Sequence, residues 1–526
     1  METNILYYGD NLEILRKYIP DNSIDLVYLD PPFNSNVAYN ILFKEPTGEP
    51  SQAQITAFDD TWHWGLESEK EFQEIILHAP VNVAELITAF RNFIHQNDVM
   101  AYLVMMCIRL LELKRVLKET GSIYLHCDPT ASHYLKTLMD TIFGMDNFKN
   151  EIAWKRFNFH ADAKRFGRVS DRILFYSKSK NYKFNRMRTS FSDDYIANKF
   201  THFDSEGRLF RVDNLNPPAN RGPVYEYHGV TKAWRFTKEK MLQLEAEDRI
   251  YTDSKIPQLK RYLDELEGQA IHDVWTDIPG INSQAKERLG YPTQKPTMLL
   301  ERIIQASSDK SDVILDPFCG CGTALIAAQK LNRKWIGIDI THLAIGIMKW
   351  RLDKIFPGIK YKVIGEPKDL TGAKELAKEN KFEFQWWVVS LISGQPYGDK
   401  KKGADTGIDG YLYFMDEKDK VKKAIISVKG GGTSVKDIRD LGHVIDREKA
   451  DIGIFITLEQ PSRPMETEAV TKGFYHSPLG KDYPRLQILT VENLLNGKKP
   501  DIPPWVAPIQ SQTKHVREPS ETAKLL

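Results

Sequence analysis

The stretch DVILDPFCGCGTALIAAQKLNRKWIGID, residues 312–339, decides the fold class of this chain. It begins with an apolar run that ends at Asp316 and predicts a buried strand. A turn with two glycines follows, then an apolar segment of helical length (324–331), and then a second apolar run that ends at Asp339. Strand, helix and strand in this order form a βαβ unit, the building block of a parallel sheet covered by helices. We therefore expect an α/β protein.

The turn of this unit has the composition of a ligand-binding loop. Gly320 and Gly322 permit close approach of a ligand to the backbone, and an acid at the position of Asp339 can accept hydrogen bonds from ribose hydroxyls. The pattern is not G-x-G-x-x-G, and no P-loop lysine follows. The turn therefore favours a small adenosine ligand over a dinucleotide or a nucleoside triphosphate. Tight packing at a strand–helix turn is the alternative interpretation.

A second strand end near the start of the chain carries a different group of side chains. The apolar run 24–29 predicts a buried strand, and Asp30-Pro31-Pro32-Phe33 follows it. Two prolines end a strand because each lacks an N–H and fixes φ. The resulting stiff loop presents a carboxylate, a carbonyl and an aromatic face, which together suit a planar substrate with an exocyclic amine. The alternative is a strand-ending turn with a packed phenylalanine.

Further strands and helices alternate through the first 180 residues. Residues 4–8 predict a strand that runs into Gly9-Asp10, and residues 81–117 have helical periodicity. Residues 34–65 carry Asn, Pro and Gly and predict a long loop. The remaining predicted elements are a helix over 11–18, strands over 121–128, 151–156 and 172–176, and a helix over 133–143.

Composition narrows the class of protein. The chain has 526 residues, which is too many for one core, and a formal net charge of +1, so any nucleic-acid contact must come from local patches. Its 4 cysteines are too few for a disulfide framework and fit a reducing cytoplasm. No apolar run reaches membrane-spanning length, and residues 1–4 do not resemble the start of a signal peptide. We expect a soluble cytoplasmic protein without a membrane partner.

Five segments describe the expected organisation. Regular patterning fades between about 181 and 290, where aromatic and basic residues interleave and proline pairs break the chain. A charged stretch, 365–380, predicts a linker. The expected segments are one half of the main domain (1–180), an inserted region (181–290), the second half (291–364), a smaller domain (381–495) and a tail (496–526).

Taken together, these motifs resemble the S-adenosylmethionine-dependent DNA amino-methyltransferases. Asp30-Pro31-Pro32-Phe33 is similar to their catalytic D-P-P-Y/F/W, and residues 316–323 are similar to their D-P-F-x-G-S-G-T cofactor loop. Residues 291–296 match the T-Q-K-P segment that precedes that loop. The catalytic loop comes first in the chain, as in the circularly permuted β group, and the resemblance to modification subunits of type III restriction systems is particularly close. Cys321 stands where the family usually has Ser.

The resemblance implies a fold and a set of site residues. It implies a Rossmann-like methyltransferase sheet, circularly permuted, with an inserted target-recognition region over 181–290. Asp30, Pro31, Pro32 and Phe33 would be catalytic. The residues implied for S-adenosylmethionine binding are Asp10, Thr293, Lys295, Asp316, Pro317, Phe318, Gly320, Gly322, Thr323 and Asp339.

The resemblance also implies the reaction. Asp30 and the Pro31 carbonyl would accept both hydrogens of an adenine N6 amine, and Phe33 would stack on the base after it flips out of double-stranded DNA. Cytosine-N4 methylation is the alternative, although Ser more often replaces Asp30 in such enzymes. A restriction subunit or a second copy of the chain would be a further partner.

The smaller domain resembles the Mrr type of the PD-(D/E)xK restriction-endonuclease fold. Its implied nuclease-like pocket consists of Glu383, Asp409 and Lys429, in a smaller α/β restriction-endonuclease-like domain. Ser427 stands where a second metal-binding acid or Gln is usual, which weakens a site for a hard cation. We therefore expect no metal here and a DNA-binding or interaction module, with an active nuclease in a bifunctional enzyme as the alternative. Cys319 and Cys321 lack a second ligand pair, so a zinc site is not expected.

Overall fold

The computed structural model describes most of the chain. The described ranges are 1–31, 38–44, 50–59, 64–129, 131–157, 166–282, 285, 287–289, 291, 293–392, 394–397, 407–417 and 420–503. Pro32 and Phe33, two of the predicted catalytic residues, therefore lie outside the described residues. By contacts the chain forms two compact units, one of residues 1–184 with 274–526 and one of residues 185–273.

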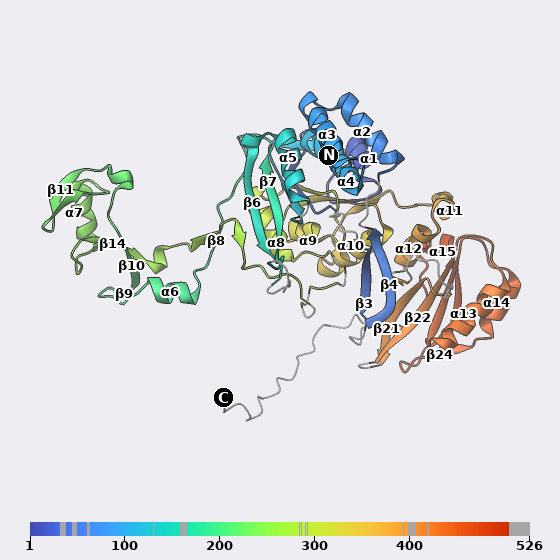
Figure 1. Cartoon of the computed structure of the whole chain (residues 1–526). Coiled ribbons are helices and arrows are strands. Elements are labelled where there is room, and N and C mark those ends of the chain that lie inside the picture. The colour runs from blue at the N-terminus through green and yellow to red at the C-terminus, as the bar shows by residue number, and fades with distance from the viewer. Residues whose placement is uncertain are drawn as a thin grey trace. The chain divides into compact units, whose positions relative to one another are not determined.

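A nine-stranded sheet forms the centre of the first unit (Figure 1). Six neighbouring strands, β5 to β19 in sheet order, run parallel, whereas β7 is antiparallel to β5 and β6 is antiparallel to β7. In sheet order the strands are β16 (Val274–Trp275), β6 (Phe148–Lys155), β7 (Ser170–Ser177), β5 (Leu117–Cys127), β2 (Ile24–Leu29), β17 (Val313–Asp316), β18 (Lys334–Asp339), β1 (Ile5–Tyr8) and β19 (Lys362–Ile364). The α/β prediction is confirmed.

The central strands of this sheet have continuous apolar sequences. Helices cover both faces of the sheet there, so residues that point to either face are buried. β2 and β17 are buried along their whole lengths. Residues of α4 (Asp98–Val116), which is buried along most of its length, share one core with Val27 and Leu29. The helices around α4 are α1 (Asn11–Tyr18), α2 (Leu66–His78), α3 (Val81–Ile94) and α5 (Ser132–Phe143). Further helices are α8 (Thr297–Ser307), α9 (Thr323–Lys330) and α10 (His342–Ile355).

Two predictions for the first half of the chain were wrong. The loop predicted over 34–65 contains two antiparallel strands, β3 (Ala38–Lys44) and β4 (Pro50–Asp59). The helix predicted over 81–117 is two helices, because His95 adopts a positive φ of 60° and Asn97 then caps α4 by accepting a hydrogen bond from the Met100 amide. An apolar period continues across this break, which is why the sequence pattern does not reveal it.

The second unit is built from short antiparallel strands. Its largest sheet has the order β13-β14-β10-β9, and β11 pairs with β12. Trp234 and Met241 are fully buried in its small core. The strands are β8 (Arg188–Thr189), β9 (His202–Phe203), β10 (Leu209–Asp213), β11 (Val224–Tyr227), β12 (Val230–Ala233), β13 (Ile250–Tyr251), β14 (Gln258–Tyr262) and β15 (Gln269–Ala270), with helices α6 (Asp193–Lys199) and α7 (Lys238–Ala246). Residues from 274 onward return to the first unit as β16.

The C-terminal part of the first unit carries its own sheet, in the order β20-β21-β22-β23-β26. The predicted linker over 365–380 was wrong in part, because α11 (Leu370–Glu379) buries Ala373 in the same core as Phe384. The strands are β20 (Gln395–Pro396), β21 (Gly410–Glu417), β22 (Lys420–Lys429), β23 (Ile452–Thr457) and β26 (Leu486–Thr490), beside the hairpin β24 (Phe474–His476) and β25 (Asp482–Pro484). The helices are α12 (Lys381–Leu391), α13 (Val435–Arg447), α14 (Arg463–Val470) and α15 (Val491–Leu495). Among the described residues, none of the helices combines the length and the hydropathy needed to cross a membrane.

Candidate functional site

Four acids that follow or end neighbouring parallel strands surround one cavity. In sheet order these are Asp30 after β2, Asp316 at the end of β17, Asp339 at the end of β18 and Asp10 after β1. Ligands of open α/β sheets bind at such carboxyl ends. The cavity has a volume of about 240 Å³ and is lined by all four acids. The other predicted site residues that line it are Pro31, Thr293, Lys295, Pro317, Phe318, Gly320 and Thr323.

The glycine turn fits closely around its neighbours. Gly320 has a φ of 49°, and a Cβ there would lie 3.2 Å from the Tyr291 ring. Gly322 has a φ of 76°, begins α9, and would place a Cβ 2.7 Å from Met348 Cγ. Both positions therefore require glycine, for backbone conformation and for space. Gly320 faces the cavity, whereas Gly322 serves packing behind it.

Asp339 connects the turn to the start of α10. Its Oδ2 accepts a hydrogen bond of 2.9 Å from the Gly320 amide, and its Oδ1 accepts from the amide and the hydroxyl of Thr341, both at 3.0 Å. Desolvation raises the pKa of this carboxyl to about 6, although these hydrogen bonds oppose the shift. A carboxylate at this position thus holds the loop together and can still present oxygen to a ligand.

Asp316 is the most deeply enclosed of the four acids, with 3% of its surface exposed. One oxygen accepts a hydrogen bond of 3.1 Å from the Phe318 amide. Burial, reinforced by the charges of Asp30 and Asp339, raises the pKa of Asp316 well above its ordinary value. This shift favours the protonated carboxyl, which can donate a hydrogen bond as well as accept one.

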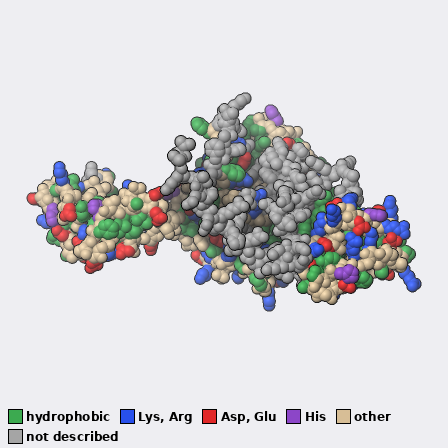
Figure 2. Space-filling view, turned by 90° about the horizontal axis from the view of Figure 1, so that it is seen from below, with side chains coloured by type: hydrophobic (Ala, Val, Ile, Leu, Met, Phe, Trp, Pro, Cys, Tyr) green, Lys and Arg blue, Asp and Glu red, His purple; other side chains and the backbone are tan. Residues whose placement is uncertain are grey.

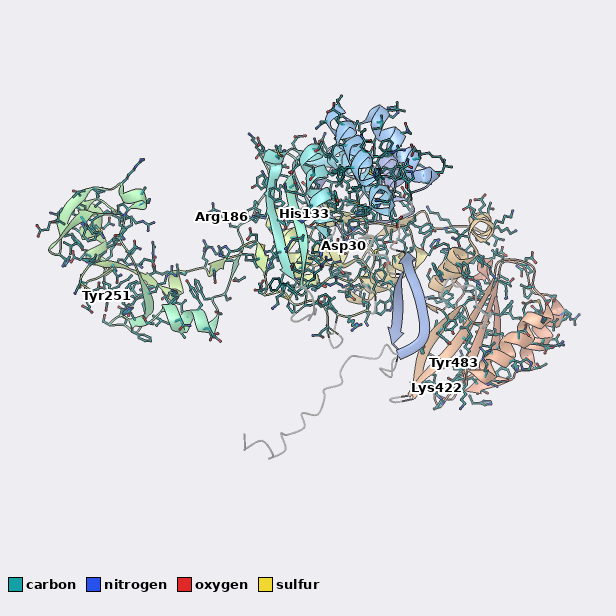
Figure 3. The ribbon with its side chains drawn as sticks, in the orientation of Figure 1. Asp30, His133, Arg186, Tyr251, Lys422 and Tyr483 are labelled. Carbon is teal, nitrogen blue, oxygen red and sulfur yellow. The ribbon has the colours of Figure 1, made fainter. Side chains whose placement is uncertain are left out.

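Asp30, which is labelled in Figure 3, forms an ion pair with Lys295 from the segment that precedes α8. The Lys295 side chain is 6% exposed, so the pair is well shielded from solvent. The other carboxylate oxygen, Asp30 Oδ1, is buried and has no hydrogen-bond partner among the residues that the structure describes. Buried polar atoms are normally satisfied, so an open acceptor beside a cavity indicates a place for a donor from a ligand.

Arg109 is a site residue that the sequence interpretation missed. Only 6% exposed, its guanidinium donates to Asp10 Oδ2 at 2.9 Å, to Asn11 Oδ1 at 2.6 Å and to Glu71 Oε1 at 3.0 Å. Asn11 in turn donates to the Pro317 carbonyl at 2.9 Å. One arginine of α4 therefore ties the loop after β1 to the loop after β17. A single arginine within the apolar run of α4 is the signal that points to it.

A buried chain of polar side chains starts at Tyr28, which also lines the cavity. The Tyr28 hydroxyl lies 3.0 Å from His126 Nδ1, and His126 Nε2 lies 3.0 Å from Asp171 Oδ2. Burial, with the nearby charges of Asp30 and Asp316, raises the pKa of Tyr28 well above its ordinary value. A histidine within an apolar strand is the sequence signal for this hydrogen-bonded series of side chains, and our sequence-based predictions did not include it.

The predicted nuclease-like residues lie in different surroundings. Asp409 Oδ1 accepts a hydrogen bond of 2.8 Å from Gln385, and its Oδ2 accepts one of 2.6 Å from the Val428 amide. Lys429 Nζ is 4.0 Å from Asp437 Oδ1. Glu383 instead accepts from the His342 amide of α10 at 3.2 Å. Among the described residues there is no cluster of three or more His, Cys, Asp or Glu arranged to hold a metal ion.

The sheet, the cavity at its strand ends and the convergent acids define an α/β protein with a candidate ligand site at the carboxyl ends of parallel strands. Residues 24–349 match the family model described as DNA methylase. That match covers more than half of the chain, and the protein therefore belongs to the DNA methylase family. Residues 387–496 match a model described as NACHT-associated inactive Restriction Endonuclease 1, which supports a restriction-endonuclease-like domain without singling out the Mrr type.

Several curated proteins are similar to the methylase part. Type II methyltransferase M.EcaI of Enterobacter cloacae is 34% identical over 344 residues, covering 64% of this chain and 66% of that protein. The StyLTI Mod subunit, a type III restriction-modification enzyme of Salmonella typhimurium, is 27% identical over 355 residues, covering 63% and 50%. The match thus spans half to two thirds of these relatives. DNA adenine methyltransferase YhdJ of Escherichia coli is 25% identical over 354 residues, covering 67% of this chain and 83% of that protein.

Two solved structures also align with most of the chain, at low sequence identity. A DNA modification methylase from Thermus thermophilus, complexed with S-adenosyl-L-methionine, matches 69% of this chain and 99% of its own, with 16% identity and a TM-score of 0.35. PvuII DNA methyltransferase, described as cytosine-N4-specific, matches 68% of this chain and 89% of its own, with 13% identity and a TM-score of 0.32.

Proposed function

We propose that the protein is a site-specific DNA methyltransferase that transfers a methyl group from S-adenosylmethionine to the N6 amine of adenine. Membership of the DNA methylase family supports the class of reaction. The observation that carries the proposal is the buried Oδ1 of Asp30, open among the described residues, on the wall of a cavity formed by three further acids. An exocyclic amine can supply an N–H donor to this oxygen.

The cavity suits the cofactor by its chemistry. Asp339 would accept from the ribose hydroxyls, and Asp10, held by Arg109, would accept from the adenine amine. Gly320 lines the cavity without a side chain, so its backbone would lie close to the ligand. Bound there, S-adenosylmethionine supplies an electrophilic methyl group on a sulfonium. Because several acids surround the cavity, a cationic ligand is favoured over an anionic one.

Asp30 and Pro31 would prepare the amine for attack. The lone pair of an adenine amine is delocalised into the ring, which makes the nitrogen a weak nucleophile. Acceptance of one hydrogen by Asp30 Oδ1 and of the other by the Pro31 carbonyl favours a pyramidal nitrogen and stabilises the positive charge that develops on it. Lys295 keeps the second oxygen of Asp30 occupied and so aims Oδ1 toward the amine.

Reaching the cavity requires the base to leave the stack, and Phe33 would support the flipped base. The unit of residues 185–273 would read the DNA sequence. Its acidic and basic side chains alternate with apolar ones on the face in Figure 2, and several of its arginines are paired with acids. Recognition by this unit would therefore rest on a few placed side chains rather than on a uniformly positive surface. A restriction subunit or a second copy of the chain would complete the enzyme in the cell.

Product analysis tests the proposal directly. Purified protein is incubated with unmethylated plasmid DNA and tritiated S-adenosylmethionine, and the DNA is digested to nucleosides. We expect label in N6-methyl-2′-deoxyadenosine with the unchanged protein and at least roughly 100-fold less label with Asp30→Asn. Asp440→Asn, at an exposed acid of α13, is the matched control and should retain full activity. Label in N4-methyl-2′-deoxycytidine alone would overturn the choice of base, and no label in DNA would overturn the function.

The second candidate is a bifunctional enzyme that also cuts DNA. The nuclease-like fold favours it, but Asp409 already has a hydrogen-bond donor on each oxygen and Ser427 replaces an acid. We therefore expect plasmid DNA to stay intact with Mg²⁺, with or without S-adenosylmethionine. Cleavage that disappears in Asp409→Ala would establish the bifunctional alternative.

A further inference from the structure

The helix α12 contributes side chains to two different cores. Phe384, Trp387 and Val388 are fully buried in the core of the C-terminal domain. Trp386, 4% exposed, is buried instead with Tyr291, Cys321 and Leu343 of the methylase part. The helix α12 therefore belongs to the cores of both domains.

The residues around Trp386 are those that shape the cavity. Cys321 lies between the two glycines of the turn, and Tyr291 packs against Gly320. The Cys321 carbonyl and the Thr323 hydroxyl both accept from Arg351 of α10, each at 3.1 Å. Movement of the Trp386 ring would therefore be transmitted through Cys321 to the turn that faces the ligand.

A second contact fixes the other side of the cavity. Glu383 Oε2 accepts a hydrogen bond of 3.2 Å from the amide of His342, the first residue of α10. The His342 ring is stacked on Tyr8 with 3.7 Å between centroids, and Tyr8 directly precedes Gly9-Asp10. Further along the same helix pair, a Cβ on Gly346 would lie only 3.2 Å from Ser390 Cβ, so the two helices approach closely.

We propose that α12 makes the C-terminal domain part of the cofactor site, with Trp386 and Glu383 as positioning residues for the loops after β17, β18 and β1. This inference rests on the proposed function. Because coupling between two sites is reciprocal, cofactor binding also stabilises the C-terminal domain. The domain then contributes to methyl transfer without any nuclease chemistry.

Truncation of Trp386 tests the inference. We expect Trp386→Ala to raise the Kd for S-adenosylhomocysteine and the KM for S-adenosylmethionine by roughly tenfold or more, with kcat at saturating cofactor changed less than about threefold. Trp386→Phe should restore most of the affinity, because a large ring still fills the site. Trp350→Ala, at a half-exposed tryptophan of α10, is the matched control. Equal affinities for the unchanged protein and Trp386→Ala would overturn the inference.

Hydrogen exchange measures the reciprocal effect. Addition of S-adenosylhomocysteine should slow amide exchange in the peptide covering 381–392 of the unchanged protein and leave it unaffected in Trp386→Ala. If Trp386→Ala does not fold, two variants of Glu383 replace it. Glu383→Ala should weaken S-adenosylhomocysteine binding, whereas Glu383→Gln retains an acceptor and should bind nearly normally. If the unchanged protein binds S-adenosylhomocysteine but exchange in 381–392 is not slowed, the coupling between the cofactor site and α12 is contradicted and the proposed function is not. Failure of the unchanged protein to bind contradicts the proposed function itself.

Discussion

Asp30 and Asp409 stand near the strand ends of two sheets of the same chain, and they are used in opposite ways. Asp30 has one oxygen paired with Lys295 and the other buried without a partner among the described residues. Asp409 has both oxygens engaged, by Gln385 and by the Val428 amide. A buried acceptor left open costs stability and is retained where a ligand completes it. Asp409 has no oxygen left open in this way.

The surroundings of the two acids extend the contrast. Asp30 shares its cavity with Asp10, Asp316 and Asp339, and Lys295 and Arg109 are paired with two of these four acids. Ser427, which precedes Val428 in β22, is buried and carries no charge. Asp30 follows a strand and has an oxygen open beside a cavity, whereas Asp409 directly precedes β21 and is bonded within its own domain.

Replacement of Asp30 should produce the largest effect. The Asn side chain of Asp30→Asn can adopt two orientations. In one, its N–H group faces the substrate amine where an acceptor is needed; in the other, the N–H group faces Lys295 and the ion pair is lost. We expect kcat to fall by at least roughly 100- to 1000-fold, the usual loss for a group that stabilises charge in the transition state. Affinity for S-adenosylhomocysteine, measured by calorimetry, should stay within a few fold. A variant that methylates normally would remove the distinction between the two acids.

Arg109→Met should be next in size. It removes the buried donor shared by Asp10, Asn11 and Glu71, so two partly exposed carboxylates lose their partner. We expect a loss of about 3 kcal/mol in the free energy of unfolding, as for other buried ion pairs deprived of one member. Urea denaturation followed by circular dichroism measures it. Arg172→Met, at a half-buried arginine of β7 paired with Glu151, is the control and should cost much less.

Cofactor affinity should depend on pH through Asp339. Its pKa is raised to about 6 by desolvation, and the charged form is the better acceptor for ribose hydroxyls. Affinity for S-adenosylhomocysteine should therefore weaken as the pH falls through about 6. The free energy of unfolding depends on pH in the opposite direction. Because the folded state raises the pKa of Asp339, this group stabilises the fold at low pH, and the stabilisation is lost as the pH rises through about 6. Calorimetry between pH 5 and about 8 should show the affinity change in the unchanged protein and not in Asp339→Asn.

Asp409→Ala should have the smallest effect of the four. It leaves the Gln385 amide and the Val428 N–H without their acceptor, which costs about 1–3 kcal/mol of stability. At temperatures where the C-terminal domain remains folded, kcat for methyl transfer should not change. Thermal denaturation and a methylation assay on the same sample measure both quantities. A large loss of kcat with the fold intact would mean that Asp409 is more than structural.

The elements that end in Asp30, Asp316 and Asp339 could be predicted because each is an apolar run closed by an acid and by Pro or a polar turn. Their placement on neighbouring strands comes from the sheet order β2-β17-β18, which no local pattern specifies. The partners of these acids could not be predicted in the same way. Arg109 meets Asp10 across 99 residues of chain, and Lys295 meets Asp30 across 265, and such contacts leave no local pattern.

Local patterns also failed where tertiary contacts override them. The periodicity of 81–117 hides a helix break at His95, and the charged stretch that forms α11 buries little more than Ala373. Trp386 and Trp387 are adjacent and chemically identical, yet each belongs to a different core. Only the packing of α12 against two domains distinguishes them.

The position of β17 between β2 and β18 has a consequence for synthesis on the ribosome. β1 and β2 emerge first, but the strands that pair with β1 and one of the two that pair with β2 lie beyond residue 312. At about 5–20 residues per second, these edges stay unpaired for on the order of 15–60 s. The nascent chain therefore cannot complete the cavity during this interval, because two of its four acids lie at the ends of β17 and β18.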